Sequence, residues 1–192
     1  MSEFSESFHA CTSNRGSVIT MLQRAGVSGL IVASNERCVS FVIDDPEREA
    51  DVIAVSRGVL ARYHYGEDHG LWIKLHRDGE PLTAIALVWD PHARTFAELG
   101  EHEKPQKVEP AATTAQKLAR AGVLGDAEAI ELCRVLEAFS PKDPEARERV
   151  MEAIPRLLGF AAYRWLSAAY AQASGPEELR RLFPGLEVVE IS

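Results

Sequence analysis

The dipeptide Asp78-Gly79, which lies between two apolar runs, constrains the fold more than any other short feature of this chain. Asp-Gly is a strong signal for a two-residue β-hairpin turn, because both residue types tolerate the positive φ that the turn requires. The residues before the turn alternate, so one strand face carries Leu71, Ile73 and Leu75 and the other carries Trp72, Lys74 and His76. The sequence therefore predicts a hairpin of strands 71–76 and 82–89.

A second hairpin is predicted closer to the N-terminus, where the apolar runs 30–33 and 39–43 flank a polar turn. Before it, apolar residues recur at helical spacing, so we expect a helix that Ser13 or Asn14 caps and Gly26 ends. Two hairpins in one chain favour antiparallel strand pairing.

The acidic segment that begins at Asp44 and contains Pro46 is typical of a helix start, because proline and acidic side chains favour the first turn. We expect this helix to continue to residues 63–66. Residues 1–14 are polar and rich in serine and are predicted to be a flexible lead-in. Residues 15–99 are then the predicted α+β sheet region, with a short added strand at 96–99.

The chain beyond Pro110 is predicted to be mostly helical. Residues 100–110 are polar, contain two prolines and are the predicted linker. Helices are expected at 115–121, 127–139, 144–158, 161–173 and 175–183, before a last strand at 186–191. We therefore expect an α+β protein: an antiparallel sheet built from two β-hairpins with helices packed on one face, followed by a mostly helical region, 111–192, that packs with the first part as one compact unit.

The net charge of −8 and the pI near 5.3 argue against a nucleic-acid binder and against docking on anionic lipid, since both need a basic surface. The three cysteines are widely spaced and form no disulfide framework, which favours a reducing compartment. No signal-like segment and no membrane-length apolar run occurs in the sequence. We expect a cytoplasmic protein with no membrane partner.

Common catalytic motifs are missing from the sequence: it has no phosphate-binding loop, no dinucleotide-binding glycine motif, no zinc-protease motif, no serine-hydrolase elbow and no EF-hand loop. We therefore expect no cofactor and no catalytic residue, and a function outside catalysis is favoured.

Residues 64–69 nevertheless contain the residue types of a metal or acid–base site. If the preceding helix continued, His64 and Asp68 would lie on one helical face, with His69 beside them. A metal site of these three residues, or a pocket near His64, Asp68 and His76, is one hypothesis. A solvated polar loop is the other, because Gly66 would end the helix before such a face forms, and we expect no metal ion.

Trp72 and His76 lie on the strand face opposite Leu71, where they either pack under a helix or form part of a recognition surface. An acidic cluster of Glu98, Glu101 and Glu103 falls at the predicted linker and is either solvated or a patch for a basic partner. These five residues are the candidate binding residues.

Residues 63–80 resemble a pattern of small bacterial immunity-type proteins, in which a charged stretch with Asp68, Gly70 and Trp72 leads into a strand, an Asp-Gly-Glu turn and a second strand. The expected α-β-β-α-β-β order also resembles the start of roadblock-type scaffold domains. Both families work by binding, so the resemblance supplies no catalytic residues.

The leading functional hypothesis is a non-enzymatic bacterial protein-binding module, with immunity-like neutralisation of a basic partner. One alternative is an enzyme or small-ligand binder that uses the pocket described above. Another is a self-associating structural protein, and the sequence does not determine the oligomeric state.

Overall fold

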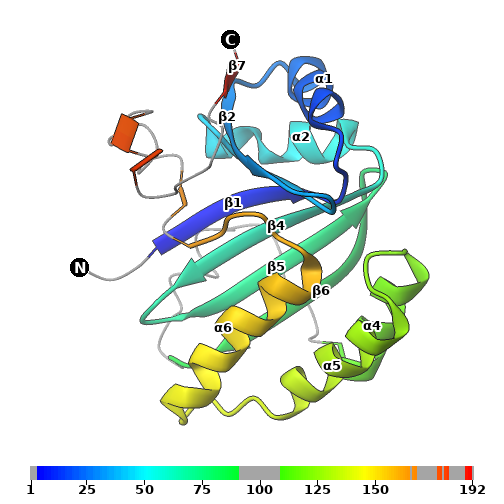
Figure 1. The fold of residues 1–192 in the computed structure, drawn as a ribbon, viewed down its shortest axis with the longest axis vertical. Helices are drawn as coiled ribbons and strands as arrows, with labels where there is room; N and C mark the ends of the chain where they lie inside the picture. The colour runs from blue at the N-terminus through cyan, green and yellow to red at the C-terminus, as the bar shows by residue number, and fades with distance from the viewer. Residues whose placement is uncertain are drawn as a thin grey trace.

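The computed structural model describes residues 4–90, 109–164, 166–167, 177–178, 180–181 and 189–191. Within these ranges, seven strands form an antiparallel sheet in the order β6-β5-β4-β1-β3-β2-β7 (Figure 1). The strands are β1 (Phe4–Ala10), β2 (Gly29–Ser34), β3 (Val39–Ile43), β4 (Val59–Gly66), β5 (Gly70–Arg77), β6 (Glu80–Val88) and β7 (Val189–Ile191). The helices are α1 (Arg15–Ala25), the short 3-10 turn η1 (Pro46–Arg48), α2 (Glu49–Val55), α4 (Ala111–Arg120), α5 (Asp126–Glu137) and α6 (Pro144–Leu158).

The first part of the chain follows the order β-α-β-β-α-β, with the strand order β4-β1-β3-β2. β3 lies between β1 and β2 and is antiparallel to both, so β1 and β2 run parallel and form a split β-α-β unit. This is the ferredoxin-like arrangement, which hosts many unrelated functions. β5 and β6 extend the sheet beyond β4, and β7 extends it beyond β2.

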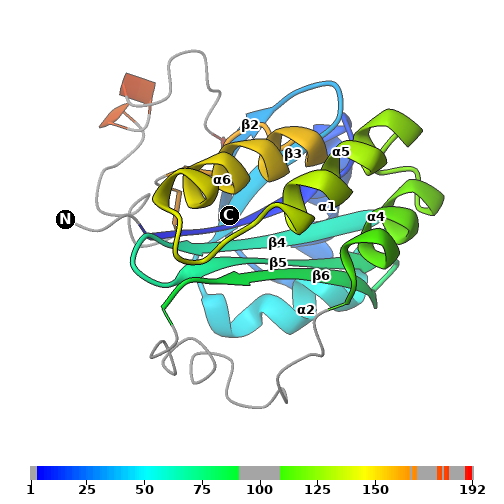
Figure 2. The same ribbon diagram turned by 90° about the horizontal axis from the view of Figure 1, so that it is seen from below.

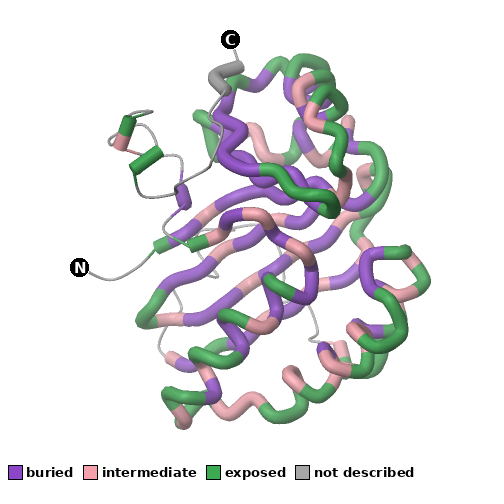
Figure 3. The backbone as a smooth tube through the Cα atoms, viewed as in Figure 1, coloured by how far each residue is buried: buried purple, intermediate pink, exposed green. Residues whose placement is uncertain are grey.

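Helices cover both faces of this sheet, so the prediction of helices on one face is wrong. α1 and α2 pack on one face, where Phe8, Phe41 and Leu60 meet Leu22 and Val52; we call it the α1–α2 face. Figure 2 shows α6 and α2 on opposite sides of the strands. The physical reason is visible along β3, which is buried at every position and therefore needs cover on both sides (Figure 3).

The opposite face, which we call the α4–α6 face, packs against the C-terminal helices. Tyr63, Ile73 and Ile85 of neighbouring strands meet Leu118 of α4 and Ile154 of α6 in one apolar cluster. Leu71, Ile73 and Leu75 of β5 all lie on the α4–α6 face, which is the apolar side that the sequence alternation predicts for this strand.

Residues 4–10 form strand β1 in the middle of the sheet, so the prediction of a flexible lead-in is wrong for this segment. β1 pairs with β4 along its whole length and with β3 over residues 8–10. Its composition hides this role, because only Phe4, Phe8 and Ala10 are apolar, while Ser5, Ser7 and His9 are polar and nevertheless fully buried.

The second helix ends at Val55, and residues 59–66 form strand β4, so the prediction of a helix that continues to residues 63–66 is wrong. Ser56 adopts extended backbone and Gly58 has a φ of 74°, which together break the helix. Beyond the break the side chains that pack into the cluster with α4 and α6 follow the period of two that is typical of a strand, at Val59, Ala61, Tyr63 and Tyr65.

Local turn and cap signals are confirmed elsewhere. α1 begins after Asn14, whose side chain accepts a hydrogen bond from the Ser17 N–H at 3.2 Å, and the chain leaves the helix at Gly26 with a φ of 63°. β2 and β3 form the first predicted hairpin, and β5 and β6 form the second. Asp78 and Gly79 take φ values of 54° and 89°, the positive pair of a type I′ turn.

α4, α5 and α6 agree with the helical character predicted for the C-terminal region. The helix predicted over 161–173 is wrong where the chain is described, because residues 161–164 and 166–167 are not helical. This segment instead crosses the α4–α6 face over β1 and β3.

The remaining C-terminal predictions have mixed outcomes. Residues 177–178 and 180–181 are helical and β7 falls within the predicted last strand. The predicted strand 96–99 and residues 100–108 of the predicted linker lie outside the described residues.

Arg37 ties the β2–β3 turn to the C-terminal helices. Its guanidinium donates to the Glu128 carboxylate at 2.7 Å and to the carbonyl oxygens of Val123 at 2.8 Å and Leu157 at 3.0 Å. The Gly125 N–H and this guanidinium both hold the pKa of Glu128 below its usual range. One side chain thus connects a β-turn with the α4–α5 loop and the end of α6.

Arg37→Ala is expected to lower the free energy of unfolding by about 1–3 kcal/mol, because it leaves two carbonyl oxygens without their donor. Arg156→Ala is the matched control, since this exposed arginine lies near Arg37 on the same groove. The control should change stability by no more than about 0.5 kcal/mol. Chemical denaturation measures both, and equal effects would contradict the proposed clamp.

Candidate functional site

A row of aromatic side chains crosses neighbouring strands on the α1–α2 face. The register places His64 of β4 opposite Trp72 of β5, and their rings meet edge to face with centroids 6.1 Å apart. Phe4 of β1 meets the His64 ring in the same way at 5.0 Å. Val88 of β6 lies on the same sheet face, two residues beyond Ala86, which is the residue opposite Trp72. We call Phe4, His64, Trp72 and Val88 the Trp72 patch.

The Trp72 patch reaches the surface. Phe4 and Val88 are each 41% exposed, and only Ile130 among the other large apolar side chains of the described residues is also exposed. Trp72 itself is partly exposed and belongs to none of the three apolar clusters of the described core.

Glycine at position 70 shapes this patch. A Cβ atom there would lie 2.7 Å from the Trp72 ring and 2.5 Å from the Leu87 carbonyl oxygen, so the indole occupies the space that a side chain would need. The absence of a side chain at Gly70 therefore lets Trp72 lie close against its own strand, beside the row of Val88.

The charges beside the patch are largely balanced. Arg62 forms ion pairs with Glu6 of β1 and, at 2.8 Å, with Glu49 of α2. Burial lowers the pKa of His64 to about 4; Glu6 opposes this effect, and Arg62 and Lys74 add to it. His64 is therefore neutral at pH 7, and the patch is an apolar, aromatic surface with Lys74 at its side.

The other histidines and acids of the predicted metal site are spread apart. His64 lies on a strand, so the helical face that would unite it with Asp68 does not form. Asp68 is exposed in the β4–β5 turn, and the Nδ1 atom of His69 lies 3.5 Å from the carboxylate of Asp90. His76 lies four residues beyond Trp72 on β5, opposite Leu60 of β4 rather than beside His64. Within the described ranges, no three His, Cys, Asp or Glu side chains are grouped so that they could hold a metal ion.

The candidate binding residues divide between the two parts of the chain. Trp72 and His76 share the α1–α2 face, and their alternation with Leu71 is as predicted. Glu98, Glu101 and Glu103 lie outside the described residues.

A buried polar network lies on the α4–α6 face of β1 and β3. The Nε2 atom of His9 lies 2.9 Å from the Ser7 hydroxyl, and Nδ1 lies 2.8 Å from the Ser40 hydroxyl. Ser40 also accepts a hydrogen bond from the Ala162 N–H at 3.2 Å. Ser5 is fully buried on the same face. These residues sit in an interior that is otherwise apolar, so every bond in the network matters for stability.

The segment 159–167 covers this network, and we call its described residues, 159–164 and 166–167, the strap. Phe160 stacks on the His9 ring with centroids 3.7 Å apart, and both rings meet Tyr63 edge to face. The Glu6 N–H donates to the Leu166 carbonyl oxygen at 2.6 Å, which fastens the strap to β1. Burial lowers the pKa of His9 to about 3, so its imidazole is neutral and closed off from solvent.

Sequence reasoning missed this network because it took residues 1–14 for a lead-in. The signal was present as an alternation, in which Phe4 and Phe8 interleave with Ser5, Ser7 and His9. This alternation is typical of a strand with one apolar and one polar face. The polar face of β1 is buried only because the strap covers it.

A wide groove of about 840 Å³ lies between α5, α6 and the β2–β3 turn, with Phe160 and Tyr163 of the strap among its lining residues. Charges of both signs line it: Arg37, Arg149, Arg156, Glu131 and Glu152. Arg37 is already held by Glu128, and Arg149 pairs with acids of its own helix start. The groove therefore presents mixed charge rather than a site for one kind of ion.

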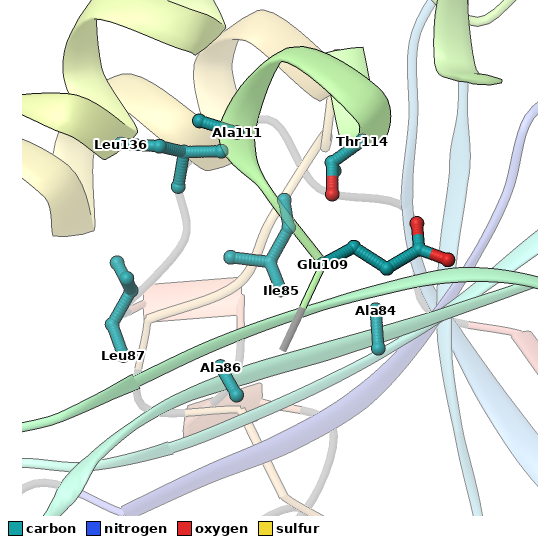
Figure 4. Close-up of a pocket in the computed structure, with 8 residues that line it drawn as sticks. All are labelled: Ala84, Ile85, Ala86, Leu87, Glu109, Ala111, Thr114 and Leu136. Atoms are coloured by element: carbon teal, nitrogen blue, oxygen red, sulfur yellow. The ribbon is translucent and has the colours of Figure 1, made fainter. Parts of the chain in front are cut away.

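A smaller pocket of about 110 Å³ lies under α4 beside strand β6. Figure 4 shows Glu109 and Thr114 at one end of it, and Leu87 and Leu136 at the other. Thr83 donates to Glu109 at 3.0 Å, and Lys117 pairs with the same carboxylate and holds its pKa below the usual range. The volume is below that of a typical small-molecule site, and its one carboxylate is already satisfied.

No helix in the described part of the chain is long and apolar enough to cross a membrane. Neither of the two pockets above is lined by His64, Asp68 or His76. Comparison with protein-family models, with curated proteins and with solved structures finds no match to this chain.

Proposed function

We propose that this protein acts by binding another protein, without catalysis, and that the Trp72 patch is its contact surface. The observation that carries the proposal is the row of Phe4, His64 and Trp72 across three strands, which reaches the surface at Phe4. Tryptophan is among the residues that most often dominate the energy of protein interfaces.

The patch has the physical character of an interface centre. Its rings sit on paired strands, so little conformational entropy is lost when a partner covers them. His64 is neutral at pH 7, and Arg62 is balanced by two carboxylates, so covering the patch buries little uncompensated charge. Lys74 supplies a polar rim on the same strand.

The partner that we propose is a basic protein with an apolar contact segment. The chain carries a net charge of −8, which accelerates association with a positively charged partner by long-range attraction. An immunity-like role, in which the partner is a basic toxin, is the specific form of this proposal. Attraction of this kind weakens as salt is added, whereas the apolar contact does not.

Two alternatives are less well supported by the arrangement. A small-ligand site near His64, Asp68 and His76 would need these side chains to converge, and they lie on two strands and a turn. Self-association through the Trp72 patch would bring together two copies of an acidic chain, which repel each other at low salt.

Trp72→Ala is expected to weaken partner binding by about 2 kcal/mol or more, a loss of roughly 30-fold in affinity, because it removes the centre of the apolar contact. The measurement is affinity capture from a bacterial lysate by the immobilised protein at low and at high ionic strength. We expect a basic protein that the wild type retains at low salt and Trp72→Ala does not.

Ile130→Ala is the matched control for that experiment. Ile130 is 56% exposed and lies on α5, which packs on the other sheet face, so its loss should leave capture unchanged. Circular dichroism establishes that each variant is folded. The proposal would be overturned if Trp72→Ala and the wild type captured the same proteins in equal amounts. It would also be overturned if the wild type retained only further copies of itself and sedimentation showed a stable oligomer.

A further inference from the structure

Two of the three cysteines lie next to the paired ends of adjacent strands: Cys11 follows the last residue of β1, and Cys38 precedes the first residue of β3. The β1–β3 pairing ends with Ala10 opposite Val39, so the same antiparallel register, continued by one residue, brings Cys11 opposite Cys38. Cys11 packs against the apolar cluster that contains Cys38, and each thiol is close enough to Arg37 to feel its charge. Both cysteines are reduced in this structure.

The backbone hydrogen bonds of Cys11 and Cys38 show whether the two residues correspond to a hydrogen-bonded or a non-hydrogen-bonded pair of an antiparallel ladder. The Cys11 N–H donates to the Val59 carbonyl oxygen of β4 at 2.8 Å, away from β3. The Cys38 N–H donates to the Asn35 side chain at 2.8 Å, and its carbonyl oxygen accepts from the Asn35 N–H at 2.9 Å, away from β1. Cys11 and Cys38 therefore correspond to a non-hydrogen-bonded pair, one position beyond the last pair of the β1–β3 ladder.

That position suits a disulfide. The Cα atoms of a non-hydrogen-bonded pair lie about 4.5 Å apart, which is within the span of about 4.4–6.8 Å that disulfides bridge. We propose that Cys11 and Cys38 are a redox pair that closes a cross-strand disulfide between β1 and β3. The cross-link joins two central strands and encloses residues 12–37, which include α1 and β2.

The two thiols differ in access, which assigns their roles. Cys11 is partly exposed, whereas Cys38 is fully buried beneath the strap, where hydrogen bonds from the Ala161 backbone and the Ser40 hydroxyl reach its sulfur. Burial raises the pKa of Cys11 to about 11 and raises that of Cys38 further, so oxidation is slow at pH 7 and the reduced form persists until an oxidant accumulates.

The oxidant that we assign is a low-molecular-weight disulfide such as oxidised glutathione. The Cys11 thiolate attacks one sulfur of the oxidant, breaks its S–S bond and releases one thiol, which leaves a mixed disulfide on Cys11. The Cys38 thiol then loses its proton, attacks the Cys11 sulfur and releases the second thiol. Two protein thiols are oxidised by two electrons, and one small disulfide is reduced to two thiols.

The test is incubation of the folded protein with oxidised glutathione, followed by mass spectrometry. The wild type should lose the mass of two hydrogens, and a non-reduced digest should join the peptides that contain Cys11 and Cys38. Thermal unfolding of the oxidised form should shift upward by about 5–10 °C, because the cross-link restricts the unfolded chain.

Two variants make the result specific. Cys38→Ser should stop at a stable glutathione adduct on Cys11, because the resolving sulfur is gone. Cys133→Ser should behave like the wild type, since Cys133 lies on α5 and contacts Glu137 instead. A wild type that keeps its thiols, links Cys133, or forms the Cys11–Cys38 bond only in denaturant would overturn the proposal. The result is independent of whether the Trp72 patch binds a partner.

Discussion

Acidification from pH 7 to pH 4 is expected to lower the free energy of unfolding by about 3 kcal/mol through His9 alone. Burial lowers the pKa of His9 from 6.5 to about 3, so the folded protein keeps a neutral imidazole while the unfolded chain takes up a proton. This stabilisation is fully present above pH 6.5 and is lost as the pH falls. The whole loss, about 5 kcal/mol, is reached only below pH 3, where His9 is protonated in the folded protein as well.

The measurement is the slope of unfolding free energy against pH from urea denaturation between pH 7 and pH 4.5. His9→Asn should reduce the slope near pH 5 by about 1.4 kcal/mol per pH unit, which is the effect of one proton. Asparagine keeps a hydrogen-bonding group near Ser7 and Ser40.

His64→Asn is a second, independent test of the same slope. Burial lowers the pKa of His64 to about 4, so this variant should reduce the slope near pH 5 by slightly less than His9→Asn does, and it leaves the contribution of His9 in place. The double variant should lose both contributions. An unchanged slope in His9→Asn, with the protein folded at pH 7, would show that His9 is not held neutral by burial.

Phe160→Ala is expected to lower the free energy of unfolding at pH 7 by about 3–5 kcal/mol. Phe160 is 7% exposed and stacks on His9, so its removal opens a cavity above the polar network. Water then reaches His9, and its pKa should rise toward 6.5. The variant should therefore be less stable at neutral pH and yet lose less additional stability on acidification than the wild type.

Lower stability at pH 7 together with a smaller loss on acidification would show that Phe160 shields His9, because the loss of an ordinary core side chain lowers stability without changing the acid slope. Phe139→Ala is the matched control, because Phe139 is partly buried at the end of α5 and contacts Trp89 rather than His9. It should lower stability at pH 7 by a smaller amount and keep the acid slope of the wild type. A Phe160→Ala variant whose slope is also unchanged would mean that Phe160 does not shield His9.

The sequence predicted the parts of the fold that depend on near neighbours. Asp78 and Gly79 specify their turn through their own backbone preferences, and Asn14 and Gly26 mark the two ends of α1. The helices α4, α5 and α6 follow from apolar spacing within each segment. These features do not depend on the distant parts of the chain.

The same reasoning failed where a distant partner decides the structure. Residues 59–66 carry apolar side chains at spacings that fit either a helix or a strand, and pairing with β1 and β5 makes them a strand. The polar face of β1 is interior only because the strap, more than a hundred residues later, lies over it.

The candidate sites divide in the same way. The alternation along β5 was enough to predict that Trp72 and His76 lie on the face opposite Leu71. That Phe4 and His64 lie beside Trp72 follows only from the pairing of β1 with β4 and of β4 with β5. The proposed pairing of Cys11 with Cys38 rests on the β1–β3 register, which the sequence alone does not provide.

By itself, then, the sequence determined an α+β protein with antiparallel hairpins, acidic charge and no common catalytic motif. Only the tertiary structure decided that helices cover both sheet faces, that His9 is sealed inside, and which residues meet across strands. The physical reason is that turns and caps act over a few residues, whereas sheet order and burial are decided by contacts between segments far apart in the chain.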